Sequence, residues 1–140
     1  MKLVLHILLL TMLSSSVPED LTIEVRNIYP VEGKLYFAMY DNKAAFMDID
    51  AASHYKIVDV KDTIETIIFE DVNQGHYAVA IFQDLNGNGT LDKNALGIPS
   101  EPYGFSNDAR GKMGPPKFKD AAFSFSGVEK ILINLINNEK

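Results

Sequence analysis

Oxygen-bearing side chains stand at every second position of one short stretch, residues 84–92, which also contains two glycines. Calcium takes six to eight oxygen ligands at about 2.3 to 2.6 Å, and alternate residues of a tight loop can all point at one centre. Gly89 supplies a positive φ angle that a residue with a side chain resists. The predicted calcium ligands are the side chains of Asp84, Asn86, Asn88 and Asp92 and the backbone carbonyl of Thr90.

This predicted calcium site is incomplete as a local motif. The stretch matches the first nine positions of a helix-loop-helix calcium loop, but the twelfth, where a bidentate glutamate is expected, is Ala95. Either a distant acid, Glu101 or Asp120, completes the shell, or the affinity is in the millimolar range of extracellular modules. A purely structural interpretation also stands, because Asn86-Gly87 and Asn88-Gly89 are common turn dipeptides. Magnesium fits less well, since it retains water and requires octahedral geometry.

Serine or zinc chemistry has little support in the sequence. Ser106 is not in a Gly-x-Ser-x-Gly turn, and a nucleophilic serine needs a base within hydrogen-bond reach. The histidines outside the first residues, His54 and His76, belong to no triad motif and lack the close acids of a zinc site. We therefore expect Ser106 and Asn107 to satisfy backbone groups of a turn while Phe105 fills an apolar gap.

Two other functions stay open on the sequence. Asp84, Asp92 and Glu101 could supply the acid and base of a hydrolase that acts on an envelope polymer. Alternatively, tyrosine rings could stack on sugars in a carbohydrate- or peptide-binding module. The tyrosines available for such a face are Tyr36, Tyr40, Tyr55, Tyr77 and Tyr103, of which the first two alternate with Leu35, Phe37 and Met39.

The elements that would position these residues are strands. Apolar residues recur with a period of two, or in short β-branched runs, between turn residues such as Pro30, Gly33 and Gly75. The predicted strands cover residues 21–25, 35–39, 55–60, 64–69, 76–82, 122–125 and 130–136. The strand at 76–82 is apolar on both faces, which predicts a central position in its sheet. This pattern predicts an all-β fold, an antiparallel β-sandwich of about seven strands.

One segment, residues 85–120, shows no sustained period and is rich in glycine and proline. Connections of this length are uncommon in compact domains and are usually functional or disordered. Its aromatic and apolar residues, which disordered segments generally lack, favour order. We expect one long ordered loop folded over an end or edge of the sandwich.

Several motifs together resemble a known bacterial family. They are Gly75-His76-Tyr77-Ala78-Val79, the 84–92 stretch, Gly97-Ile98-Pro99-x-Glu101, Tyr103-Gly104-Phe105-Ser106-Asn107 and Pro116-x-Phe118-x-Asp120-Ala121-x-Phe123. In order and spacing they are similar to the exported bacterial proteins grouped as domain of unknown function 2141. The resemblance implies an exported bacterial domain with a prealbumin-like or immunoglobulin-like sandwich, and it implies no established activity.

Composition limits the compartment and the partners. Residues 1–16 combine a basic start, an apolar run and small residues, which predicts a signal peptide followed by a single domain over residues 17–140. The apolar run is too short for a membrane helix, and the net charge of −6 argues against nucleic-acid binding. The chain has no cysteine, so neither disulfides nor a lipid-modified cysteine can hold or anchor it.

The sequence therefore predicts a periplasmic or secreted, non-enzymatic β-sandwich of unknown role. A structural calcium ion bound at residues 84–92 would order a recognition or bracing surface for a protein or glycan partner.

Overall fold

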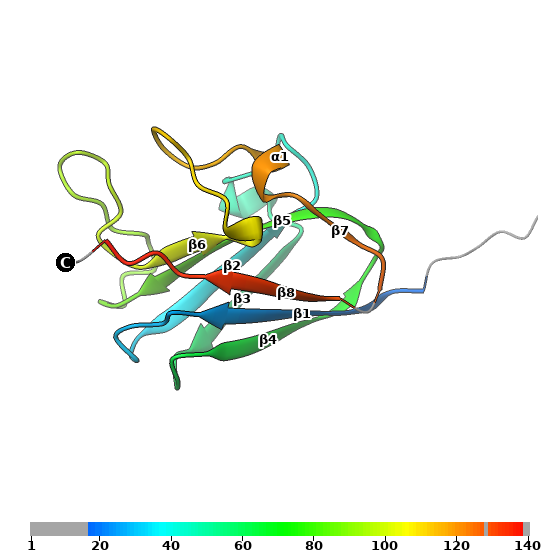
Figure 1. The fold of residues 1–140 in the computed structure, drawn as a ribbon, viewed down its shortest axis with the longest axis horizontal. Coiled ribbons are helices and arrows are strands. Elements are labelled where there is room, and N and C mark those ends of the chain that lie inside the picture. Colours follow the sequence, from blue (N-terminus) through cyan, green and yellow to red (C-terminus); the bar gives the residue numbers. More distant parts are fainter. Residues whose placement is uncertain (1–16, 128, 139–140) are drawn as a thin grey trace, which may run out of the picture.

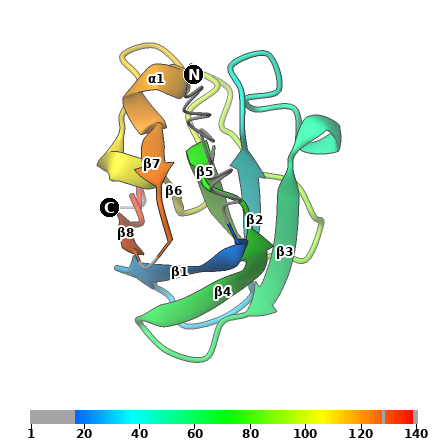
Figure 2. The same cartoon turned by 90° about the vertical axis from the view of Figure 1, so that its right-hand side faces the viewer.

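The strands of this chain form two facing sheets. The computed structural model describes residues 17–127 and 129–138, and the predicted signal peptide lies outside these residues. Figures 1 and 2 show the two layers from perpendicular directions. The strands are β1 (Glu19–Arg26), β2 (Lys34–Tyr40), β3 (His54–Asp59), β4 (Glu65–Val72), β5 (Gly75–Asp84), β6 (Tyr103–Phe105), β7 (Phe123–Phe125) and β8 (Lys130–Asn134). Two 3-10 turns, η1 (Ile49–Ala51) and η2 (Ser106–Asp108), and a short helix, α1 (Phe118–Ala121), complete the described elements.

The predicted all-β sandwich is confirmed, with one change in strand direction. The larger sheet has the order β3-β2-β5-β6, with β7 pairing the first residues of β5, and the smaller sheet has the order β4-β1-β8. All pairs are antiparallel except β1 and β8, which run parallel. The strands β7 and β8 belong to different sheets, so they do not form a hairpin and need not run in opposite directions.

Period-two alternation buries one face of the longer strands β1, β2, β4 and β5 between the sheets. Leu21, Ile23 and Val25 of β1 are fully buried, and they face the inner residues of the larger sheet. The same core contains Leu35, Phe37 and Met39 of β2, Tyr77, Val79 and Ile81 of β5, Ile67 and Phe69 of β4, and Ile133 of β8. β5 lies between β2 and β6, as its doubly apolar pattern predicted.

The segment predicted as one long loop is ordered, but it contains regular structure that the prediction missed. It includes β6, η2 and α1 between residues 103 and 121. A three-residue strand is too short to show a period, and β6 forms because it pairs with Ala80–Phe82 of β5. Gly104 lets this strand approach β8, since a Cβ there would be 3.1 Å from Ile133.

The outer face of the larger sheet is only partly covered. α1 and η2 pack on β5 through an apolar cluster that includes Phe105 and Ala121. The yellow-green loop after β5 and the gold loop before α1 both rise on this side of the molecule (Figure 1). Across residues 17–127 and 129–138, no helix has the length and apolar character needed to cross a membrane.

Candidate functional site

The carboxylate of Asp84, at the end of β5, organises the start of the predicted calcium loop. Asp84 is buried, its Oδ1 accepts the N–H of Gly87 at 2.7 Å, and its Oδ2 accepts the N–H of Gly89 at 2.8 Å. Both glycines have positive φ angles, 78° and 77°, as predicted for Gly89. Burial raises the pKa of Asp84, but these backbone N–H groups lower it more, so the net shift is below the ordinary value of 3.8.

Glu101 is the distant acid that reaches this loop. Its side chain is buried, with Oε1 accepting the N–H of Leu85 at 2.9 Å and Oε2 accepting the N–H of Asp92 at 3.0 Å. One carboxylate therefore joins the two ends of the loop. The other candidate, Asp120, lies in α1, which packs on β5 and η2.

The remaining predicted ligands gather around Asp92. The Asn86 Nδ2 donates to Asp92 Oδ2 at 2.5 Å, and the Asn88 Nδ2 donates to both carboxylate oxygens of Asp92, at 2.9 and 3.1 Å. The amide oxygens of Asn86 and Asn88 accept backbone N–H groups two residues further on, those of Asn88 and Thr90. The five residues predicted from the sequence therefore come together in one turn, and this turn is built from Asx-type hydrogen bonds.

The donor set of this loop suits a hard cation, although its acids do not converge. Every donor is oxygen, and the carboxylate oxygens of Asp84 and Glu101 accept backbone N–H groups of the loop. No lysine, arginine or histidine of the described residues forms an ion pair with Asp84, Asp92 or Glu101. Within residues 17–127 and 129–138, no three acidic or histidine side chains are grouped so as to hold a metal. Calcium here would therefore also need amide and carbonyl oxygens.

A groove on the outer face of the larger sheet lies beside this loop. Ala38 of β2 pairs with Ala80 of β5, and these two small side chains form an alanine floor. Next to the floor, Tyr36 and Phe82 stack with ring centroids 4.8 Å apart. The groove has a volume of about 330 Å³, within the range of about 300 to 1,000 Å³ usual for small-molecule sites.

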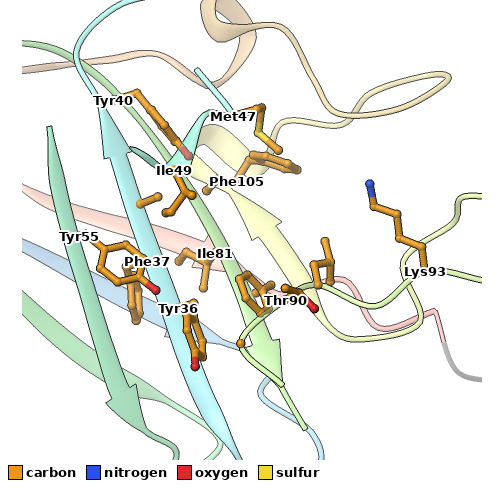
Figure 3. Close-up of a pocket in the computed structure, with 15 residues that line it drawn as sticks. Tyr36, Phe37, Tyr40, Met47, Ile49, Tyr55, Ile81, Thr90, Lys93 and Phe105 are labelled. Atoms are coloured by element: carbon orange, nitrogen blue, oxygen red, sulfur yellow. The ribbon is translucent and has the colours of Figure 1, made fainter. Parts of the chain in front are cut away.

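The predicted calcium loop forms one wall of this groove. Figure 3 shows Thr90 and Lys93 on the loop side and Tyr55 on the opposite side. Gly89 lies close to the side chain of Tyr36, and a Cβ at Gly89 would be 3.6 Å from the Tyr36 hydroxyl. The full lining is Tyr36, Phe37, Ala38, Tyr40, Met47, Ile49, Tyr55, Ala80, Ile81, Phe82, Gly89, Thr90, Leu91, Lys93 and Phe105.

A second hollow of about 610 Å³ continues the groove toward the loops after β5 and before α1. The two share Met47, Leu91, Lys93 and Phe105. The second hollow also includes Lys112 and the exposed side chains of Leu96, which is 83% exposed, and Met113, which is fully exposed. Exposed apolar side chains that line a concave surface are typical of a binding site.

The sequence identified part of this face. Tyr36, Tyr40 and Tyr55 line the groove and Tyr103 lines the second hollow, but Tyr77 belongs to the inner core and is not on this face. Tyr77 is on the same face of β5 as Val79 and Ile81, as the alternation of the strand already indicates. Met47, Ile49 and Lys93 were missed, because they come from loops and from the short element η1, which carry no periodic signal.

The remaining residues considered for chemistry have structural partners. Ser106 is fully buried, its Oγ accepts the N–H of Val79 at 2.9 Å and it donates to the carbonyl of Ala121 at 2.5 Å. Asn107 donates to the carbonyl of Ala122 at 2.8 Å, so both residues satisfy backbone groups, although these belong to β5 and to residues 121–122 and not to their own turn. His54 contacts the Ser53 hydroxyl and His76 contacts the Ser124 hydroxyl, each at 3.1 Å. Burial holds the pKa of His54 below its ordinary value of 6.5.

Comparison with known proteins gives a family and no function. The profile of the family described as "Uncharacterized protein conserved in bacteria (DUF2141)" matches residues 23–132. This range includes the oxygen-rich loop and all strands of the larger sheet. No curated protein and no solved structure matches the chain.

Proposed function

Since the chain belongs to this bacterial family of uncharacterised proteins, we rely on the site itself and propose that the chain is an exported, non-enzymatic binding protein. The groove on the outer face of the larger sheet is its recognition surface, and the loop at residues 84–92, ordered by calcium, is one wall of that surface.

The observation that carries this proposal is the shared position of loop and groove. Gly89, Thr90 and Leu91 belong to the oxygen-rich loop and also line the groove, and Lys93 continues the same wall. A ligand in the groove would therefore touch the backbone whose conformation Asp84 and Glu101 hold. A rigid wall reduces the free-energy cost of ordering the site when a ligand binds.

Calcium has a defined task in this proposal. It would take oxygens from Asp84, Asn86, Asn88, Thr90 and Asp92, with Glu101 behind the loop, and it would offset the charge of three nearby carboxylates. The loop is not flanked by a pair of helices, so it does not support a calcium switch of the helix-loop-helix kind.

The hydrolase alternative has no observation in its favour. The carboxylates of Asp84 and Glu101 are buried and bound to backbone N–H groups. As far as the described residues go, the linings of the groove and of the second hollow include neither of these two residues nor Asp92. A general acid or base must reach the substrate, so these three residues are better suited to hold a loop.

Thermal unfolding tests the calcium-ordered wall. The protein, expressed from the full chain, is unfolded in EDTA and then in millimolar calcium or magnesium. We expect a calcium-selective rise in the midpoint, which corresponds to about 2.7 kcal/mol when calcium is about 100 times its Kd.

Two variants locate the effect. Asp92→Asn should abolish most of the calcium-dependent rise, because Asp92 gathers both asparagine side chains of the loop. The matched control is Asp71→Asn, an exposed aspartate in β4 of the other sheet, which should keep the full rise. An equal midpoint in EDTA and in calcium would reject the calcium-ordered wall. The hydrogen bonds of the Asx-type turn would then hold the loop without a metal.

A further inference from the structure

The groove offers a ligand side chains and almost no free backbone. Ala38 of the floor pairs on one side with Tyr55 and on the other with Ala80, and Ala80 pairs in turn with Phe105. The N–H and C=O groups beneath the ligand are therefore already used within the sheet. An extended peptide lying here would leave its own backbone groups without partners, which costs free energy.

This surface is also poorly suited to binding a sugar. Of the described residues, those that line the groove and the second hollow include no Asp, Glu, Asn, Gln or Arg, and their side-chain hydroxyls are those of Tyr36, Tyr40, Tyr55, Tyr103 and Thr90. A glycan would bury many hydroxyl groups against alanine, phenylalanine and isoleucine. A ligand with a hydrocarbon middle section has neither backbone groups nor hydroxyl groups to leave unpaired in the groove, so it avoids both free-energy costs.

Charge distinguishes one end of the site from the other. In the described chain, the charged residues that line the two hollows are Lys93, at their junction, and Lys112, in the second hollow. This is unexpected by composition, because the chain has 19 acidic and 13 basic residues. Figure 3 shows Lys93 beyond the loop wall, on the side opposite Tyr55. The surface is therefore complementary to a ligand with an apolar body and one anionic end.

We propose that the groove binds a free medium-chain carboxylate, with its acyl chain over the alanine floor of Ala38 and Ala80 and its carboxylate at Lys93 and Lys112. This inference rests on the proposed function, because it names the occupant of the same recognition surface. Binding is non-covalent, and three partly exposed apolar residues form the rim of the groove, Tyr55 on β3, Ile49 in η1 and Met47 beside Phe105.

Calorimetric titration with octanoate, decanoate and dodecanoate, each below its micelle concentration, tests the proposal on the protein expressed from the full chain. We expect the affinity to rise by roughly fourfold for each added methylene until the groove is filled. The methyl ester of each acid should bind about two- to fivefold more weakly for each lysine contact it loses.

Matched pairs of variants separate the groove from the rest of the surface. Ile49→Asp places an acid at the rim of the groove and should weaken binding by tenfold or more, whereas Ile64→Asp, at an isoleucine of equal 49% exposure outside the groove, should leave the affinity unchanged. Lys93→Met should weaken carboxylate binding by about two- to fivefold, and Lys119→Met on α1 should not. All four side chains are exposed or half exposed, so these variants are expected to fold.

Several results would overturn the inference. They are no binding of any of the three carboxylates, equal affinity for acid and ester, equal effects of Ile49→Asp and Ile64→Asp, or binding only to anionic phospholipid vesicles. Repeating the titration in EDTA separates this inference from the proposed function. Carboxylate binding without a calcium-dependent midpoint rejects the calcium-ordered wall alone, and a calcium-dependent midpoint without carboxylate binding rejects the occupant alone.

Discussion

At the scale of single residues, the Glu101 side chain joins the two ends of the oxygen-rich loop through hydrogen bonds. Its two carboxylate oxygens accept the N–H groups of Leu85 and Asp92, which lie at opposite ends of the oxygen-rich loop. The side chain is 5% exposed, so these N–H groups have little access to water as a substitute acceptor. The loop conformation therefore depends on one residue that follows it by nine positions.

We predict that Glu101→Gln destabilises the protein by about 1 to 3 kcal/mol in EDTA, where no metal contributes. The amide keeps the shape of the side chain, but its nitrogen would face one of the two N–H groups, which then has no acceptor. Urea unfolding measures the loss, and Glu70→Gln, at an exposed glutamate of β4, is the control. Equal stability of the two variants would show that Glu101 does not hold the loop.

Residues close in sequence were easier to predict than residues that meet only in the folded chain. The five predicted ligands fall within residues 84–92, and the alternation of short polar side chains around glycines was enough to place them in one turn. The groove combines Met47 and Ile49 with Leu91, and no local pattern connects these segments. The doubly apolar pattern of β5 predicted its central position, but it did not show that part of its outer face is open.

At the scale of elements, Ser106 fills a break in the edge of the larger sheet. β7 pairs with β5 from Gly75 to Tyr77, and β6 pairs with β5 from Ala80 to Phe82. Between these two short partners, the N–H of Val79 donates to the Ser106 hydroxyl, and that hydroxyl donates to the carbonyl of Ala121. The Ser106 side chain thus takes the place of a neighbouring strand at Val79, between the part of β5 that pairs with β7 and the part that pairs with β6.

Ser106→Ala should destabilise the protein by about 1 to 3 kcal/mol, because it leaves the buried N–H of Val79 without an acceptor. Thermal or urea unfolding measures this loss. Ser124→Ala, which removes an exposed hydroxyl from β7, should change the unfolding free energy by less than about 0.5 kcal/mol. A stable Ser106→Ala variant would mean that water or a shift of η2 replaces the hydroxyl.

Strand prediction succeeded where alternation extends over several residues and failed where pairing alone makes the strand. Each of β1, β2, β3, β4, β5, β7 and β8 overlaps a predicted strand. β6 has three residues, and its conformation comes from its neighbour β5 and from the space that Gly104 leaves beside β8. The direction of β8 could not be read from its composition, since a parallel and an antiparallel partner need the same apolar face.

At the scale of the whole molecule, the described residues include carboxylates with lowered pKa values at three separate places. Hydrogen bonds from Lys130 and Arg26 hold the pKa of Glu24, on the smaller sheet, below its ordinary value of 4.5. A hydrogen bond from Lys34 holds the pKa of Asp59, at the end of β3, below 3.8. Asp84 is the third, through the backbone N–H groups of the loop. Each group binds protons less readily in the folded chain than in the unfolded chain.

We therefore predict that the unfolding free energy, measured in EDTA, decreases as the pH falls below about 5. The lowered groups contribute stability above their ordinary pKa values, and this contribution is lost as the pH falls through their folded-state values. Urea unfolding between pH 7 and pH 2 measures the decrease. Asp84→Asn should flatten the curve in this window, and a stability that rises toward low pH would contradict the prediction.

The parallel pairing of β1 with β8 also sets the order in which the chain can finish folding. Among residues 17–127 and 129–138, β1 is the first strand and β8 is the last, and they are direct neighbours in the smaller sheet. That sheet cannot close until residues 130–134 have left the ribosome, and contacts between such distant segments form slowly. Under the export that we propose, this delay would keep the chain open during synthesis, as threading across a membrane before folding requires.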